Sequence, residues 1–189
     1  KMSEKAIEYL EEFQENHAIP IEEILAVWMG ISEFHLEQFA VMPDSVRELE
    51  YFRDCQKWYL ERQEEEYQKL VKAYRAVISD IVYFPIPKSS SHKAAEIYYS
   101  DGWGSERIYK DTAHVHEGCD IMAGNNERGY FPIVSMTDGV VERIGWLEKG
   151  GYRIGIRSPN GGYFYYAHLY RYAQEWKEGD RVKAGDLIG

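Results

Sequence analysis

The side chains best able to do chemistry gather between Ala113 and Ala123, in the run Ala-His-Val-His-Glu-Gly-Cys-Asp-Ile-Met-Ala. Imidazole nitrogens and carboxylate oxygens are ordinary zinc ligands, at about 2.0–2.2 Å from the metal. His116 and Asp120 would lie about 13 Å apart on a straight strand, too far to share an ion. Gly118 between them permits a bend that brings the two side chains together. The segment is therefore a candidate metal site, although a loop histidine hydrogen-bonded to a neighbouring aspartate also fits it.

Three more side chains belong to the chemical inventory. His114 lies two residues before His116, and Cys119 is a candidate thiolate ligand or, as an apolar side chain, a buried one. His168 ends the aromatic run Tyr163-Phe-Tyr-Tyr-Ala-His-Leu169, where a hydrogen-bonded core or rim histidine is the ordinary alternative to a catalytic one.

The elements that must position these residues divide at about residue 90. Only Gly30 of the 16 glycines lies before residue 100, and residues 1–90 carry 10 basic and 18 acidic side chains against 12 and 14 in the remainder. Glycine is unfavourable inside helices and common in turns between strands. We therefore expect an α+β protein with a helical, acidic first half and a β-rich second half.

The first half shows helical spacing of its apolar residues, which predicts a helical domain over residues 1–83, a hairpin or short bundle. One long helix is expected from Pro43-Asp44 to about Asp80, with roughly 55 Å of length. Its apolar stripe would pack on the same domain, on a partner helix, or on a second copy of the chain. The proline- and serine-rich residues 84–99 are expected to be a linker.

The second half, residues 100–189, shows short alternating runs between glycine turns. Residues 152–157 alternate with period two, and Pro159-Asn-Gly-Gly162 is a strong hairpin signal before the aromatic run. Several such runs at close spacing predict a mostly antiparallel sheet or a partly open β-barrel.

Charge and hydropathy exclude several classes of protein. A net charge of −10 with no basic cluster argues against nucleic acid as a partner. No run approaches the ~18 apolar residues of a membrane span. Two cysteines are too few for a disulfide framework.

Four motifs in order resemble those of the lysostaphin/LytM-like zinc metallopeptidases, peptidase family M23. The chain has His116-Glu-Gly-Cys-Asp120 for the family's His-x-Gly-x-Asp, and Tyr166-Ala-His-Leu169 for Tyr-Ala-His-Leu. Residues 132–141 and 178–189 are similar to the Pro-Val-x-Ala-x-x-Asp-Gly-Val-Val and Gly-Asp-x-Val-x-x-Gly-x-x-Ile-Gly segments. The resemblance covers about residues 100–189.

The resemblance implies a site and an activity. His116 and Asp120 would be Zn2+ ligands, and His168 would be a catalytic histidine that acts as a base on metal-bound water or stabilises the oxyanion. The implied activity is cleavage of peptide bonds in bacterial peptidoglycan, outside the cytoplasm. Tyr170, Trp146 and Tyr152 are expected along the wall of a groove for the extended peptide.

The third ligand of the family comes from a later His-x-His motif, and this chain stops at Gly189 before it. We therefore expect a truncated member, incomplete at its C-terminus, whose 189 residues bind zinc weakly and have no hydrolase activity, unless His114 or Cys119 substitutes. Because the chain starts without a secretion signal, we also expect an upstream signal or membrane anchor.

Two other functions remain open at this point. Some members of the superfamily are non-catalytic regulators or scaffolds in cell division or sporulation. The Asp-Gly-Val-Val and Gly-Asp-x-Val segments also resemble biotinyl and lipoyl carrier domains, which need a lysine at a hairpin tip. The tip Pro159-Asn-Gly-Gly162 has none, which disfavours a carrier.

Overall fold

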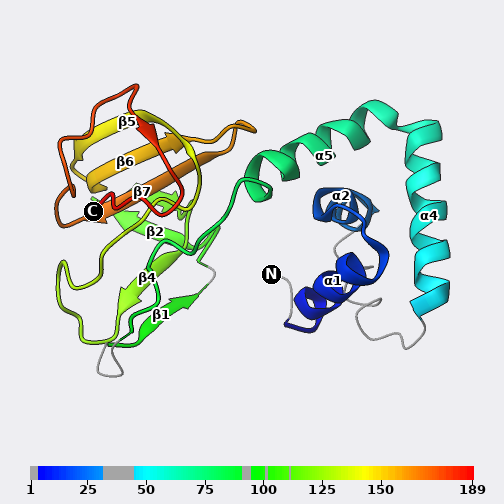
Figure 1. The fold of residues 1–189 in the computed structure, drawn as a ribbon, viewed down its shortest axis with the longest axis horizontal. Coiled ribbons are helices and arrows are strands. Elements are labelled where there is room, and N and C mark those ends of the chain that lie inside the picture. The colour runs from blue at the N-terminus through cyan, green and yellow to red at the C-terminus, as the bar shows by residue number, and fades with distance from the viewer. Residues whose placement is uncertain (1–3, 32–44, 91–94, 101, 111) are drawn as a thin grey trace. The chain divides into compact units, whose positions relative to one another are not determined.

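The computed structural model describes residues 4–31, 45–100 except 91–94, 102–110 and 112–189. The chain separates into two compact units: unit 1 is Lys1–Ile81 with Arg157–Phe164, and unit 2 is Val82–Ile156 with Tyr165–Gly189. Unit 1 holds the helices and unit 2 holds most of the strands (Figure 1). The α+β class predicted from the sequence is confirmed. None of the described helices is long and apolar enough to cross a membrane.

The helices of unit 1 surround one aromatic-rich core. They are α1 (Glu4–His17), α2 (Ile21–Ile31), α4 (Ser45–Arg62) and α5 (Glu64–Ile78). Trp28 of α2 is fully buried and lies edge-on to Phe52 of α4, at 5.6 Å between ring centroids. Phe13 of α1 also contacts Phe52, at 5.4 Å. Apolar burial of this kind stabilises short helices that would be marginal in isolation.

The single long helix predicted over residues 43–80 is wrong, because the chain turns a corner at Gln63 (Figure 1). Gln63 has φ −142° and ψ 40°, outside the helical region. In one straight helix, Tyr59 and Tyr67 would lie about 80° apart around the axis and about 12 Å apart along it. The corner instead lets both rings enter the core and stack at 6.0 Å. Glu64, at the start of α5, favours a new helix because acidic side chains stabilise helix N-termini.

The strands of the described residues form two antiparallel pairs and one four-stranded sheet. Strands β1 (Ile97–Ser100) and β4 (Asp120–Ala123) form one pair, and β2 (Glu106–Tyr109) and β3 (Thr112–Val115) form a second. The remaining strands form a four-stranded sheet in the order β7-β6-β5-β8, from β5 (Gly139–Leu147), β6 (Gly151–Arg157), β7 (Tyr163–Leu169) and β8 (Arg181–Val182). The antiparallel sheet and the hairpin at residues 158–162 agree with the sequence pattern.

Residues 97–99, which the sequence assigned to a linker, belong instead to β1. Ile97 is opposite Ala123 and Tyr99 is opposite Ile121, so this segment supports the strand that begins with Asp120. Earlier in the same stretch, Ile86 is buried and the carbonyl of Pro85 accepts the Val134 N–H at 2.9 Å. The prolines of this stretch disfavour a helix. They lie before residue 97, so they do not prevent residues 97–99 from pairing as a strand.

The core of unit 2 lies on one face of the four-stranded sheet. Its fully buried aliphatic side chains are Val141, Ile154, Ile156, Val182 and Ile188. They come from β5, β6, β8 and the last residues of the chain, so the core links segments that are far apart in sequence.

Candidate functional site

His116 and Asp120 lie side by side, although they stand at opposite ends of the β3–β4 connection. His116 follows β3 and stays in register with β2, because its N–H donates to the Ser105 carbonyl at 2.8 Å. Asp120 opens β4. The turn between them brings His116 Nε2 to 3.4 Å from Asp120 Oδ1. The bend expected at Gly118 therefore joins the two side chains that spacing alone would keep apart.

Arg107 of β2 holds the far side of this pair. Its Nη2 donates to Asp120 Oδ2 at 2.6 Å and lies 3.3 Å from His116 Nδ1. A guanidinium on one carboxylate oxygen restricts the rotation of the carboxylate and directs the other oxygen, Oδ1, toward the imidazole. Nothing in the sequence distinguishes Arg107 from the other arginines. Arg107 is identified by its position opposite His114 in the β2–β3 pair, and this register is known only from the fold.

Two groups lie beside His116 Nδ1, the Arg107 Nη2 at 3.3 Å and the carbonyl oxygen of Gly102 at 3.2 Å. In the tautomer with an Nδ1–H, the ring donates to the Gly102 carbonyl and leaves the Nε2 lone pair free for a metal. A metal-ligating histidine characteristically donates its other ring N–H in this way. A Cβ on Gly102 would lie 2.9 Å from Nδ1, so any larger residue at that position would displace the ring.

The geometry of the pair fits a tetrahedral metal ion. Two donor atoms bound to one zinc ion at about 2.0–2.2 Å lie about 3.4 Å apart. The Nε2–Oδ1 separation is 3.4 Å, and the side chains of His116 and Asp120 are 22% and 49% exposed. The pair can therefore supply one nitrogen and one oxygen ligand. Within the described residues, no group of three His, Cys, Asp or Glu side chains that could hold a metal occurs.

The other two side chains of the cluster point elsewhere. His114 Nε2 lies 2.9 Å from the ammonium of Lys149, which occupies the ring nitrogen that would otherwise be free for a metal. Cys119 is exposed, with its Sγ 3.9 Å from the backbone carbonyl oxygen of Asp120.

His168 lies at the exposed side of β7 in a strained backbone conformation. Its φ is +58°, in the left-handed region that few non-glycine residues adopt and that is often retained at functional sites. Its N–H donates to the Gly150 carbonyl at 2.7 Å, next to Gly151, which also has a positive φ. The strain turns His168 out of the alternation that buries Tyr166 and Leu169 on either side of it.

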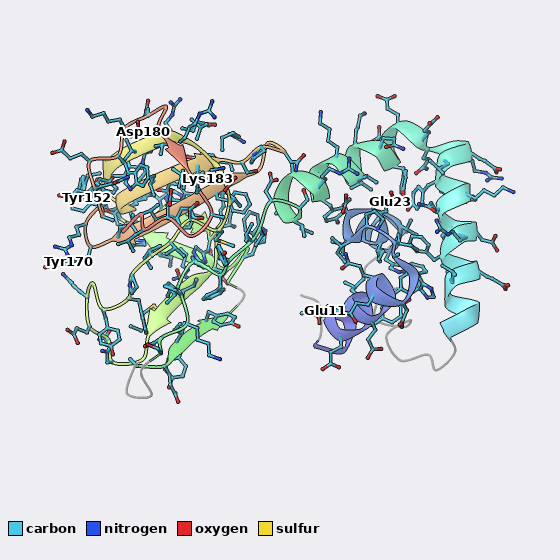
Figure 2. The ribbon with its side chains drawn as sticks, viewed as in Figure 1. Glu11, Glu23, Tyr152, Tyr170, Asp180 and Lys183 are labelled. Carbon is cyan, nitrogen blue, oxygen red and sulfur yellow. The ribbon has the colours of Figure 1, made fainter. Side chains whose placement is uncertain are left out.

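The three other motif segments bind one another and support this strand. The Tyr166 hydroxyl accepts the Met136 N–H at 2.8 Å, and burial raises the pKa of that hydroxyl above its ordinary value. Asp138 accepts both the Ala184 N–H and the Lys183 ammonium, at 2.9 and 2.8 Å. Figure 2 shows Lys183 with Asp180 beside β8.

The aromatic side chains expected along a groove are all exposed. Trp146 is 61%, Tyr152 45% and Tyr170 66% exposed, and Figure 2 shows Tyr152 and Tyr170 at the periphery of unit 2. Tyr152 also packs edge-on against Tyr172, at 5.4 Å between centroids. Their exposure is compatible with contact to an extended ligand.

Comparison with known proteins identifies a matching family and similar chains. The model of peptidase family M23 matches residues 114–189. The L-Ala–D-Glu endopeptidase of Bacillus subtilis (strain 168) is 38% identical over 124 residues, which is 66% of this chain and 35% of that protein. The chain thus spans about a third of that relative's length.

A crystal structure from Ruminococcus gnavus ATCC 29149, provisionally named a glycyl-glycine endopeptidase lytM, is 40% identical with a TM-score of 0.72. The match covers 96% of this chain and 69% of the other, so it includes the helices as well as the strands. The residues matched by the family model contain all four motifs in order, and the first motif folds into a histidine–aspartate pair. The chain belongs to the LytM-like peptidases of family M23.

Proposed function

We propose that this protein is a zinc-dependent endopeptidase that cleaves peptide bonds in bacterial peptidoglycan. The observation that carries the proposal is the His116–Asp120 pair, whose 3.4 Å separation suits two ligands of one tetrahedral ion. The relatives, at 38% and 40% identity, carry endopeptidase names. A non-catalytic role is less well supported, because His116, Asp120 and His168 are all retained.

Each residue of the candidate site has its own role in the proposed reaction. His116 and Asp120 would bind zinc, Arg107 would hold the aspartate in place, and His168 would take a proton from water or stabilise the oxyanion. A bound zinc ion lowers the pKa of its water toward about 7 and polarises the scissile carbonyl. The preset backbone at His168 would place its imidazole without further reorganisation during the reaction.

The setting of the protein is part of the same proposal. A peptidoglycan substrate implies action outside the cytoplasm, and an upstream anchor would keep the protein at the envelope. Residues 1–83 would form a separate helical domain from the peptidase domain at 100–189. Exposed apolar side chains on its helices, such as Trp58 and Leu60 of α4, offer a surface for a partner helix or a second copy.

Zinc-dependent cleavage of purified peptidoglycan by the full-length protein tests the proposal. We expect activity to be lost on chelation and restored by zinc. His168→Asn should lower kcat by about 10²–10⁴ while zinc affinity is unchanged. Asparagine tolerates a positive φ, so this variant should fold. Full activity after chelation, or in the His116→Ala variant, would refute the proposal.

A further inference from the structure

The side chain of Lys149 is anchored by two neighbours on the β2–β3 ribbon. Its ammonium lies 2.9 Å from His114 Nε2 and 4.9 Å from the centre of the Tyr109 ring. A cation is attracted both to a neutral imidazole nitrogen and to the face of an aromatic ring. A lysine on a turn, normally free to rotate, is thereby held at one place.

That place lies on the same face of the ribbon as the candidate metal pair. Arg107 is opposite His114 and Tyr109 is opposite Thr112, so these side chains share a face. His116 continues the alternation from His114 and remains in register, as its bond to Ser105 shows. Two residues of extended chain correspond to about 6.7 Å, which places the group that holds Lys149 one step from the metal pair.

Lys149 and its neighbour Lys110 differ in whether a described carboxylate is paired with them. The neighbouring Lys110 also lies over the Tyr109 ring, at 5.4 Å, but it is paired with the carboxylate of Glu148. Among the described residues, no carboxylate is paired with Lys149. A fixed ammonium whose contacts are an imidazole and a ring retains its capacity for an anion.

We propose that Lys149, positioned by His114 and Tyr109, binds a substrate carboxylate and so selects a peptide with an acidic residue beside the scissile bond. The inference rests on the proposed function, because it takes His116 and Asp120 as the point of cleavage. A glutamyl residue linked through its amino group and one carboxyl group keeps its other carboxyl free. That free carboxylate would lie about two residues of extended chain, or about 6.7 Å, from the metal pair.

Lys149 would distinguish between the two bonds for which the relatives are named. An L-Ala–D-Glu bond has a free carboxylate on its glutamyl side, whereas a glycyl-glycine bond has no side chain that Lys149 could recognise. A charge-assisted contact contributes about 1.5–3 kcal/mol, or roughly 10- to 150-fold in affinity. We therefore expect the acidic substrate to be preferred by a factor of that size.

The test uses the zinc-loaded full-length protein and three synthetic peptides. The first contains L-Ala–D-Glu, the second has the free glutamyl carboxyl converted to a carboxamide, and the third contains Gly-Gly. Dissociation constants and kcat/KM are measured separately for wild type, Lys149→Gln, Lys149→Arg and Lys110→Gln. Lys110→Gln is the matched control, since Lys110 contacts the same ring but is already paired.

We expect wild type and Lys110→Gln to bind the carboxylate peptide at least 10-fold more tightly than the carboxamide. Lys149→Gln should reduce that ratio to about one, and Lys149→Arg should retain most of it. Equal binding of the two peptides by wild type, or an unchanged ratio in Lys149→Gln, would overturn the inference. If the ratio depends on Lys149 but no peptide is cleaved, the carboxylate site stands and the proposed peptidase function falls.

Discussion

At the residue scale, the candidate site depends on which atom each side chain presents. Asp120 gives Oδ2 to Arg107 and keeps Oδ1 for His116, while His116 has Nδ1 beside the Gly102 carbonyl. One oxygen and one nitrogen are thus directed toward the same point. The two supporting contacts come from β2 and from the loop before it, so the positions of the two candidate ligands depend on residues outside their own motif.

Arg107 should act on zinc binding through Asp120. Arg107→Gln releases Oδ2, and we expect the affinity for zinc to fall about 10- to 100-fold, as is typical when the support of a ligand is removed. Competition with a chromophoric chelator would measure it. Arg143→Gln is a matched control, because Arg143 forms an exposed ion pair with Glu178 at 3.7 Å. A rise in zinc affinity would instead mean that the guanidinium competes with the metal.

At the element scale, the sheet of unit 2 is held by contacts between sequence motifs. The end of the chain returns to residue 133, where the Ile133 N–H donates to the Gly189 carbonyl and the Ile188 N–H donates to the Ile133 carbonyl. The turn at Asp138 is tied to the turn before Asp186 through Lys183 and Ala184. Many residues of the motifs that indicate the family therefore stabilise the sheet through contacts with one another.

Asp138 makes this part of unit 2 sensitive to pH. The Lys183 ammonium, followed by the Ala184 N–H, holds the pKa of Asp138 below its ordinary value. A lowered folded-state pKa adds stability that is complete above the usual aspartate pKa of about 3.9 and is lost as the pH falls through the lowered value. Asp138→Asn should therefore reduce the free energy of unfolding at pH 7 and have progressively less effect below pH 4.

Denaturant unfolding of wild type and Asp138→Asn across that pH range would measure the effect. Lys183→Met removes the same ion pair from the other side, so the double variant should be destabilised by less than the sum of the two single variants. A difference between wild type and Asp138→Asn that is constant from pH 7 to pH 3 would contradict the assignment.

At the scale of the whole molecule, the two units have different cores. Unit 1 is built around aromatic rings such as Trp28 and Phe52, and unit 2 around aliphatic side chains such as Ile154 and Ile156. The candidate site belongs to unit 2, because His116, Asp120, Arg107 and His168 all lie in it. Its geometry should therefore depend on the aliphatic core rather than on the aromatic one.

A substitution in the core of one unit should destabilise that unit and leave the other unchanged. We expect Trp28→Ala to destabilise unit 1 by about 3–5 kcal/mol and leave zinc affinity unchanged. Ile154→Ala should destabilise unit 2 by about 2–5 kcal/mol and weaken zinc binding. Calorimetry and hydrogen exchange on the whole chain would assign each effect, with exposed Trp146→Ala as the control. Equal loss of protection in both units from either variant would contradict this division.

Much of this protein follows from its sequence. Glycine distribution and spacing predicted a helical half and a β half, because local backbone preferences and alternation act over a few residues. Four ordered motifs indicated the family. They also indicated the pair His116 and Asp120, because Gly118 between them permits the bend that brings the two side chains together. The corner at Gln63 was not predicted, because the residues around it are compatible with a continuous helix. It follows from the burial of Tyr59 and Tyr67 in the same core, where their rings stack.

Only the tertiary structure decided which side chains surround the pair. Arg107 and Lys149 are ordinary basic residues in sequence, and their roles arise from strand register and from a turn that folds back over the ribbon. The sequence makes His114 a possible auxiliary ligand, and the fold places its Nε2 2.9 Å from the Lys149 ammonium. The sequence by itself indicated the candidate ligands and the kinds of element, because these depend on residue type and local spacing. The environment of the candidate ligands depends on contacts between segments up to 35 residues apart, which no local pattern encodes.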